Sequence, residues 1–188
     1  VENISCTPEV EIRNCYFTRT STRGTLMTTP RKVIIANNTY YKTGMSAILI
    51  EGDAEGWYES GPVKDVLIQN NIFIDCAYNG GPEYAVIALN PSNTIIDAAH
   101  PVHRNVRIIG NTFQTFGNPV LYAKSTEGLV FKDNKVTSTL SPGDALQKPV
   151  FILNGSKNVT IKGNILKGTF RENIVFRNMK KEFIKTDL

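Results

Sequence analysis

The hydrophobic and polar positions of the chain follow an eight-residue pattern that recurs seven times. The first and third positions are apolar, the fifth and sixth are turn-forming residues in most copies, and the eighth is apolar or aromatic. Apolar residues that alternate along a chain point to one face of a β-strand, so each copy predicts two short strands joined by a bend. The copies begin at Val10, Val33, Val66, Val106, Leu129, Val159 and, in an incomplete form, Ile174.

The return of this pattern predicts a solenoid, because each repeat can bury its apolar face only against its neighbours. Successive copies start 23, 33, 40, 23, 30 and 15 residues apart, so a coil needs at least 23 residues and the longer coils carry loops. Valine, isoleucine, phenylalanine, tyrosine and threonine dominate the repeat and favour strands over helices. The predicted fold is all-β: a right-handed, single-stranded parallel β-helix of the pectin-lyase type, forming one domain over residues 1–188.

Asparagine recurs at the sixth position of the pattern. In stacked coils these side chains would form a ladder in which each amide satisfies the backbone of its neighbour. The position before it is Asn, Asp or Gly, residues that tolerate the left-handed conformation of a tight bend. A two-sheet sandwich would also contain short alternating strands, but it would not produce this column. The predicted ladder comprises Asn38, Asn71, Asn111, Asn134 and Asn164, with Cys15 at the same position of the first copy.

A third strand is predicted between successive repeats, and we term these strands the front sheet. Alignment from the asparagine column places Thr28, Glu51 and Lys124 at equivalent outward positions, with Lys124 two coils away from Glu51. The loops after the front strands are long in the second and third coils, where they cover residues 52–65 and 90–105. Two long neighbouring loops on one edge predict the walls of a groove into which Glu51 projects.

Composition and charge narrow the classes of function. The chain has 188 residues, is 41% hydrophobic and lacks an 18-residue apolar run, which excludes a membrane-spanning helix. The net charge of +4 is spread along the sequence without a basic run, so we predict no nucleic-acid binding. The chain enters directly into a repeat and ends without an obvious cap. We therefore expect a piece of a larger protein, with the remaining domains of that protein as partners.

The cysteines and histidines do not predict a metal site or a cofactor. Three cysteines occur without a CxxC spacing, and we interpret Cys15 and Cys76 as small residues stacked in the core. The two histidines, His100 and His103, enclose a proline, which opposes the helix that an i, i+3 metal site would need.

The first long loop has the composition of a sugar-binding site. It contains Trp57 and Tyr58 among four carboxylates within nine residues. An aromatic face can stack on the apolar face of a pyranose ring, while carboxylates accept hydroxyl hydrogen bonds or act as acid and base. A second interpretation stays open, in which the two aromatic residues pin the loop to the coil below and the acids are only solvated.

Four stretches of the sequence resemble the bacterial α-1,3-galactosidases of glycoside hydrolase family 110, in the C-terminal part of their β-helix region. The resemblance covers about residues 8–140 and is carried by residues 23–30, 46–54, 57–61 and 119–124. It implies part of a hydrolase that removes terminal α-1,3-linked galactose with inversion, including that of the blood-group B determinant. It also implies no metal or cofactor, a galactose-terminated glycan as ligand, and a secreted, periplasmic or cell-surface location in a bacterium.

The resemblance also limits the site that this chain can hold. The paired-aspartate motif of the family lies on coils N-terminal to this sequence, which has no Asp-Asp pair, so we expect an incomplete site. Inverting hydrolysis needs two carboxylates about 6.5–9.5 Å apart. By position, the catalytic candidates are Glu51, Asp53 and Glu59. The expected substrate-binding residues are Arg23, Trp57 as the stacking platform, Tyr58, Asn79 and Lys124.

Two other functions use the same fold. A calcium-dependent pectin lyase would need an acidic cluster with a basic residue for proton abstraction, and a polygalacturonase would need an aspartate trio with histidine and an Arg-Ile-Lys run, which this chain lacks. A non-catalytic glycan-binding or structural β-helix would have short uniform loops, whereas two coils here carry long ones. Because a fold does not establish a reaction, these alternatives stay open at this point.

Overall fold

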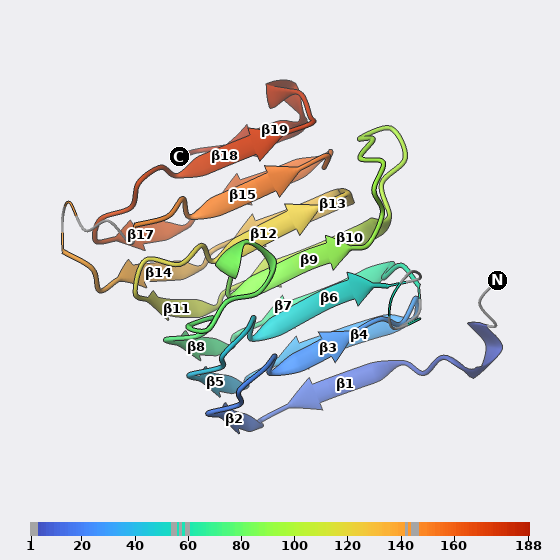
Figure 1. Cartoon of the computed structure of the whole chain (residues 1–188), viewed down its shortest axis with the longest axis horizontal. Coiled ribbons are helices and arrows are strands. Elements are labelled where there is room, and N and C mark those ends of the chain that lie inside the picture. Colours follow the sequence, from blue (N-terminus) through green and yellow to red (C-terminus); the bar gives the residue numbers. More distant parts are fainter. Residues whose placement is uncertain (1–3, 54–55, 57, 59–60, 142, 144–146) are drawn as a thin grey trace.

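The chain winds into a stack of coils, and successive coils contribute strands to three parallel sheets (Figure 1). The computed structural model describes residues 4–53, 56, 58, 61–141, 143 and 147–188. Within each sheet the strands follow one another in steps of three, as a parallel β-helix requires. The predicted fold is therefore confirmed.

The repeated pattern supplies the first two sheets. The first sheet contains β1 (Val10–Arg13), β4 (Lys32–Ala36), β7 (Asp65–Gln69), β10 (His103–Ile109), β13 (Thr126–Lys132), β16 (Val159–Lys162) and β19 (Ile184–Thr186). The second sheet contains β2 (Tyr16–Thr18), β5 (Thr39–Tyr41), β8 (Ile72–Ile74), β11 (Thr112–Thr115), β14 (Lys135–Ser138) and β17 (Ile165–Lys167).

The strands between the repeats form the front sheet, as predicted. They are β3 (Thr25–Met27), β6 (Ile48–Gly52), β9 (Ile87–Pro91), β12 (Leu121–Lys124), β15 (Phe151–Asn154) and β18 (Ile174–Arg177). Three short 3-10 helices lie outside the sheets, namely η1 (Ile4–Cys6), η2 (Pro82–Tyr84) and η3 (Lys181–Phe183).

The seventh copy of the pattern was assigned to the wrong sheet. It forms β18, which pairs with β15 in the front sheet and places Ile174 level with Phe151. The seventh strand of the first sheet is β19 instead. Its start lies 15 residues after Val159, the same offset that separates the starts of β1 and β3. Alternating apolar residues occur in every strand of the solenoid, so the alternation alone does not identify the sheet.

The asparagine ladder forms as predicted. Each ladder asparagine accepts a hydrogen bond at its Oδ1 from the backbone N–H of the preceding ladder residue, at 2.8–2.9 Å. Each Nδ2 donates to a carbonyl of the preceding coil. The residues just before the ladder have φ values between 54° and 67°, which is why Asn, Asp and Gly occupy this position.

A column of aromatic rings fills the interior beside the second sheet. Phe17, Tyr40, Phe73 and Phe113 stack with centroid separations of 4.6, 5.2 and 4.8 Å. The last three are fully buried within the main apolar cluster. The eighth position of the repeat therefore holds successive coils together through ring contacts as well as through area burial.

The front sheet is also apolar on its outer face. Leu49, Ala88, Tyr122 and Ile152 occupy one outward column and form a second buried cluster with Ala85, which follows η2. The turn that carries η2 lies in front of this sheet (Figure 1). Because both faces are covered at this column, the front strands contain nearly continuous apolar runs.

The cysteine interpretation holds for only one of the two residues. Cys76 is buried, and burial raises the pKa of its thiol. Cys15 is exposed, so its interpretation as a core residue was wrong. The side chain at the ladder position projects into the turn of the coil, where only the asparagines with ladder neighbours on both sides are fully covered.

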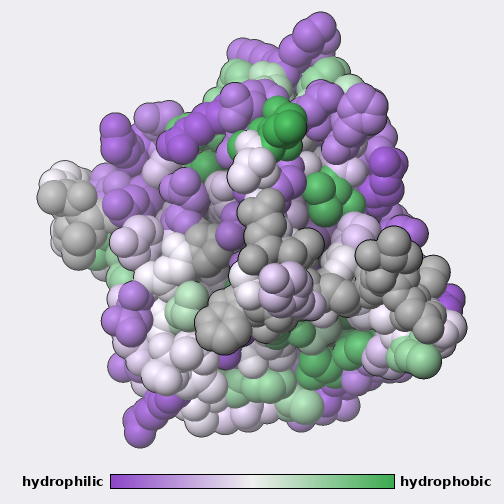
Figure 2. Space-filling view, turned by 45° about the vertical axis from the view of Figure 1, so that its right-hand side comes forward, coloured by the Kyte–Doolittle hydropathy of each residue, from purple (hydrophilic) through white to green (hydrophobic). Residues whose placement is uncertain are grey.

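The outer surface is mainly hydrophilic. The face in Figure 2 carries small, separate hydrophobic patches between polar side chains. Within the described part of the chain, no helix has the length and apolar character needed to cross a membrane.

Candidate functional site

Glu51 and Asp53 lie at the edge of the front sheet where β6 ends. Glu51 is half-buried and pairs with Asn90 of the next coil. Asp53 follows the strand, and its Oδ1 accepts a hydrogen bond from the backbone N–H of Gly56 at 2.7 Å. Residues i and i+2 of an extended chain are about 6.6 Å apart and point to the same side. The two carboxyl groups therefore belong to one outer edge.

Tyr58 is the described aromatic residue of the first long loop. Its side chain is 79% exposed, and its backbone has a φ of 56°. The ring is therefore not packed against the coil below, and the interpretation that it pins the loop is wrong for Tyr58. Trp57 and Glu59, the other two predicted residues of this loop, lie outside the described residues.

Lys124 shares the outward column of Glu51, as predicted. The register of β6, β9 and β12 places it two coils along, which corresponds to a backbone separation of about 9.6 Å. Its Nζ donates a hydrogen bond to the carbonyl oxygen of Pro91 at 2.8 Å. Lys124 thus holds the start of the second long loop beside the same edge.

Arg23 and Asn79 lie at the opposite end of the front strands. The pairing of β3 with β6 places Arg23 level with Ser46, five residues before Glu51. Five extended residues correspond to about 16 Å. The backbone N–H of Asn79 donates to the carbonyl oxygen of Gly44 at 2.6 Å, which fixes Asn79 at this far end. The structure therefore brings Glu51, Asp53, Tyr58 and Lys124 to one edge and leaves Arg23 and Asn79 away from it.

A further polar cluster on the front sheet was not predicted. Glu83 forms an ion pair with Arg177 at 3.7 Å, and Asn154 accepts a hydrogen bond from Asn178 at its Oδ1 at 2.8 Å. Burial raises the pKa of the nearby Tyr122, while a hydrogen bond with Asn154 opposes that rise. Glu83 has a φ of 47°, a costly conformation for a residue other than glycine, and the ion pair helps to hold it.

The sequence contains one signal that would have revealed this cluster. Arg177 occupies the same outward column as Glu51, Lys124 and Asn154, because β18 belongs to the front sheet. Assigning the seventh pattern copy to the first sheet hid this relation. The contact with Glu83 has no local sequence signal, because it joins a turn of the third coil to a strand of the sixth.

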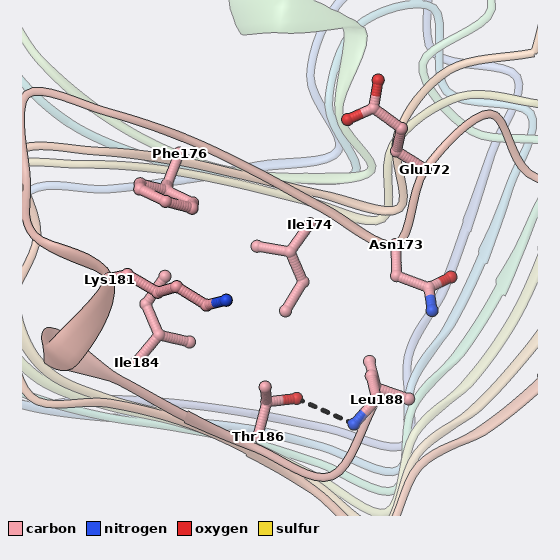
Figure 3. A pocket seen from close by; sticks show the side chains of 8 residues that line it. All are labelled: Glu172, Asn173, Ile174, Phe176, Lys181, Ile184, Thr186 and Leu188. Atoms are coloured by element: carbon pink, nitrogen blue, oxygen red, sulfur yellow. Dashed lines mark hydrogen bonds between the residues drawn. The ribbon is translucent and has the colours of Figure 1, made fainter.

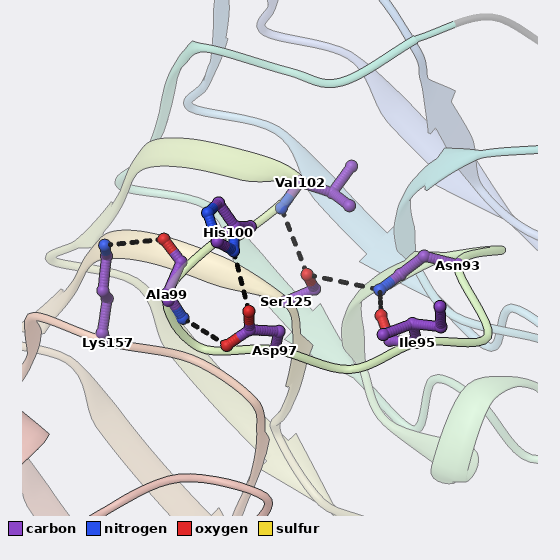
Figure 4. Close-up of polar contacts among 8 residues, drawn as sticks. All are labelled: Asn93, Ile95, Asp97, Ala99, His100, Val102, Ser125 and Lys157. Carbon is purple, nitrogen blue, oxygen red and sulfur yellow. Dashed lines mark hydrogen bonds and ion pairs between the residues drawn. The ribbon is translucent and has the colours of Figure 1, made fainter.

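The second long loop follows the predicted path only at its start. Ser92 contacts the first loop, where its N–H and hydroxyl both donate to the carbonyl oxygen of Gly52, at 3.1 and 2.9 Å. The rest of the loop bends toward later coils (Figure 4). There Val102 donates to the Ser125 hydroxyl at 3.1 Å, and Lys157 donates to a loop carbonyl at 3.3 Å. It forms a wall beside Glu51 only through its first residues.

A cavity of about 440 Å³ lies between β18 and β19, away from all of the predicted site residues (Figure 3). Ile174 and Ile184 project into it from the two strands, and Lys181 lies at its side. Among the residues that the structure describes, no three histidine, cysteine, aspartate or glutamate side chains gather as a metal site would require.

The sequence matches the family of the right-handed β-helix region over residues 3–181, and the chain belongs to this family. The match assigns the hand of the solenoid, as predicted.

Individual relatives specify the resemblance further. The chain is 66% identical over 190 residues to α-1,3-galactosidase A of Bacteroides fragilis, with 100% of this chain and 31% of that protein covered. It is 42% identical over 189 residues to α-1,3-galactosidase B of Bacteroides thetaiotaomicron, with 98% and 31% covered. For α-1,3-galactosidase A of Streptomyces avermitilis the identity is 38% over 166 residues, with 87% and 25% covered.

These relatives confirm the resemblance to α-1,3-galactosidases. The resemblance was expected to end near residue 140, but the similarity to the Bacteroides fragilis protein covers the whole chain. The chain spans about a third of the length of the first relatives.

Proposed function

We propose that the chain is part of a glycoside hydrolase that removes terminal α-1,3-linked galactose from glycans with inversion. The observation that carries this proposal is the similarity, along the whole chain, to proteins named α-1,3-galactosidases. A pectin-type enzyme and a non-catalytic β-helix are less well supported, because neither accounts for that similarity. We also propose that the protein acts at the cell surface, in the periplasm or after secretion, where glycan substrates are displayed.

The proposed galactose site is the edge at the end of β6. Glu51 and Asp53 present carboxyl groups there at a backbone spacing close to the separation of about 6.5–9.5 Å used by inverting enzymes. Tyr58 offers an exposed ring, and Trp57 and Glu59 of the same loop complete the proposed set. Lys124 positions the second loop through Pro91.

The far end of the front strands suits a different part of the substrate. Arg23 and Asn79 are separated from Glu51 by about 16 Å along the strands, which exceeds the length of one sugar ring. We assign these two residues to sugar units beyond the terminal galactose.

Activity measurements on the full-length protein test the galactose site. We expect Glu51→Gln and Asp53→Asn each to lower kcat/KM for an α-1,3-linked digalactoside and for the blood-group B trisaccharide by at least about tenfold. A charged hydrogen bond of about 1.5–3 kcal/mol would be lost in each case. Glu11→Gln, at an exposed carboxylate of β1, is the matched control and should keep full activity.

Retained activity in both variants would exclude this edge as the galactose site. Loss of activity in the Glu11 control as well would point to misfolding rather than to the site. If the unaltered full-length protein cleaves neither substrate, the proposed reaction itself is wrong.

A further inference from the structure

A second cavity lies at the corner between the second sheet and the front sheet, and we term it the corner pocket. It has a volume of about 520 Å³, within the range of about 300–1,000 Å³ typical of small-molecule sites. Its walls come from four successive coils. The lining residues are Lys42, Asp75, Tyr78, Phe116 and Thr139.

The repeat places these side chains on neighbouring coils. Lys42 follows β5 and Asp75 follows β8, and both have left-handed backbones with φ values of 53° and 49°. Their N–H groups donate to Ile74 and Gln114 of the next coils, at 2.9 and 3.0 Å. The two residues therefore hold equivalent turn positions about 4.8 Å apart.

The polar groups of the corner pocket are not used by the fold. Lys42 and Asp75 form no ion pair with each other, and the recorded contact of the Lys42 ammonium is with the ring of Tyr41, at 5.3 Å from its centroid. Within the described part of the chain, no hydrogen-bond donor contacts the Asp75 carboxylate. A carboxylate and an ammonium group thus remain available to a ligand in one cavity.

The aromatic residues define the rest of the surface. Tyr78 is 52% exposed, and Phe116 is half-exposed in the next coil. Aromatic rings present apolar faces that match the C–H face of a pyranose, while a carboxylate and an ammonium group satisfy its hydroxyls. An anionic ligand would be repelled by Asp75, and a purely apolar ligand would leave both charges without partners.

We propose that the corner pocket is a secondary binding site for a neutral pyranose unit, separate from the edge at Glu51. The two sites lie on opposite ends of the front strands. A second weak contact with a glycan raises the effective concentration of that glycan at the protein. The corner pocket therefore favours long or clustered glycans over short oligosaccharides as substrates.

Binding to the full-length protein tests the proposal, with a neutral galactose-terminated tetrasaccharide as the probe. The parent for all comparisons is Glu51→Gln, so that turnover does not consume the probe. In this background we expect the resonances of Phe116 and Thr139 to shift in NMR spectra, with a Kd of about 1 mM. Asp75→Asn and Lys42→Gln should each weaken this binding by about threefold or more, and Phe116→Ala by about tenfold.

Tyr16→Ala is the matched control, because Tyr16 is an exposed tyrosine of the same sheet outside the corner pocket. It should leave the affinity unchanged. Absence of shifts at the corner pocket, tighter binding of an anionic tetrasaccharide, or equal affinity in the Asp75 and Lys42 variants would each overturn the proposal. Because Asp75 and Lys42 belong to surface turns, their variants give a decisive result even if Phe116→Ala does not fold. Since the readout is binding, the result is also distinguishable from failure of the proposed hydrolysis.

Discussion

Replacing Asn111 with alanine is expected to lower the free energy of unfolding by about 4 kcal/mol. Asn111 is 1% exposed, and its Oδ1 accepts hydrogen bonds from the backbone N–H and the Nδ2 of Asn71, at 2.8 and 3.0 Å. Its Nδ2 donates to Ile68 and to Oδ1 of Asn134, both at 3.0 Å. Alanine would leave buried polar groups without partners, at a cost of about 1–3 kcal/mol for each group. Urea denaturation of both proteins measures the difference.

The end of the ladder supplies the control for this prediction. Asn164 is half-buried, accepts from Asn134 and donates to Phe131, but no ladder asparagine follows it. Asn164→Ala should therefore cost about half as much as Asn111→Ala. Equal losses at the two positions would show that the ladder bonds are not the source of the stability.

Acidification from pH 6.5 to pH 4 is expected to remove about 3 kcal/mol of stability through His103. This residue is fully buried, and burial lowers the pKa of its imidazole to about 4. Its Nδ1 accepts the N–H of Val63 at 3.3 Å, so the neutral ring carries its proton on Nε2. In the unfolded chain the pKa is about 6.5. Between these values the unfolded state binds more protons, so stability rises with pH across this interval and is constant above it.

Thermal unfolding at a series of pH values tests the histidine prediction. His103→Gln should flatten the stability curve between pH 4 and 6.5, even though losing the fit of the ring lowers stability overall. His100→Gln should keep the slope of the original protein, because the side chain of His100 is 86% exposed. The two positions are the only histidines of the chain, so no third imidazole contributes. An unchanged slope in the His103 variant would contradict the prediction.

The sequence was sufficient to predict the architecture, because the fold repeats its own instructions. Alternating apolar residues specified strands, and the asparagine at one fixed position specified how coils align. The column that contains Glu51 and Lys124 followed from that alignment alone. The exception was Ile174, where the same alternation served a front strand and only the 15-residue offset could identify it.

The candidate site was less predictable, because its contacts depend on loops. Counting along the coils placed Glu51 but gave no information on how far Arg23 and Asn79 lie from it. The ion pair of Glu83 with Arg177 spans three coils and depends on an unusual backbone conformation. Such contacts form only after the solenoid has brought distant segments together, so no local sequence pattern encodes them.

The outward column of the front sheet has a consequence for how such a groove can change in evolution. Residues on it stand on successive coils, so their spacing is fixed at multiples of about 4.8 Å. Duplication of one 23-residue coil would lengthen the interval between Glu51 and Lys124 by one such step and leave each coil intact. The groove therefore behaves as a ruler with discrete divisions. Gradual adjustment of reach is left to the loops, while the solenoid permits only whole steps.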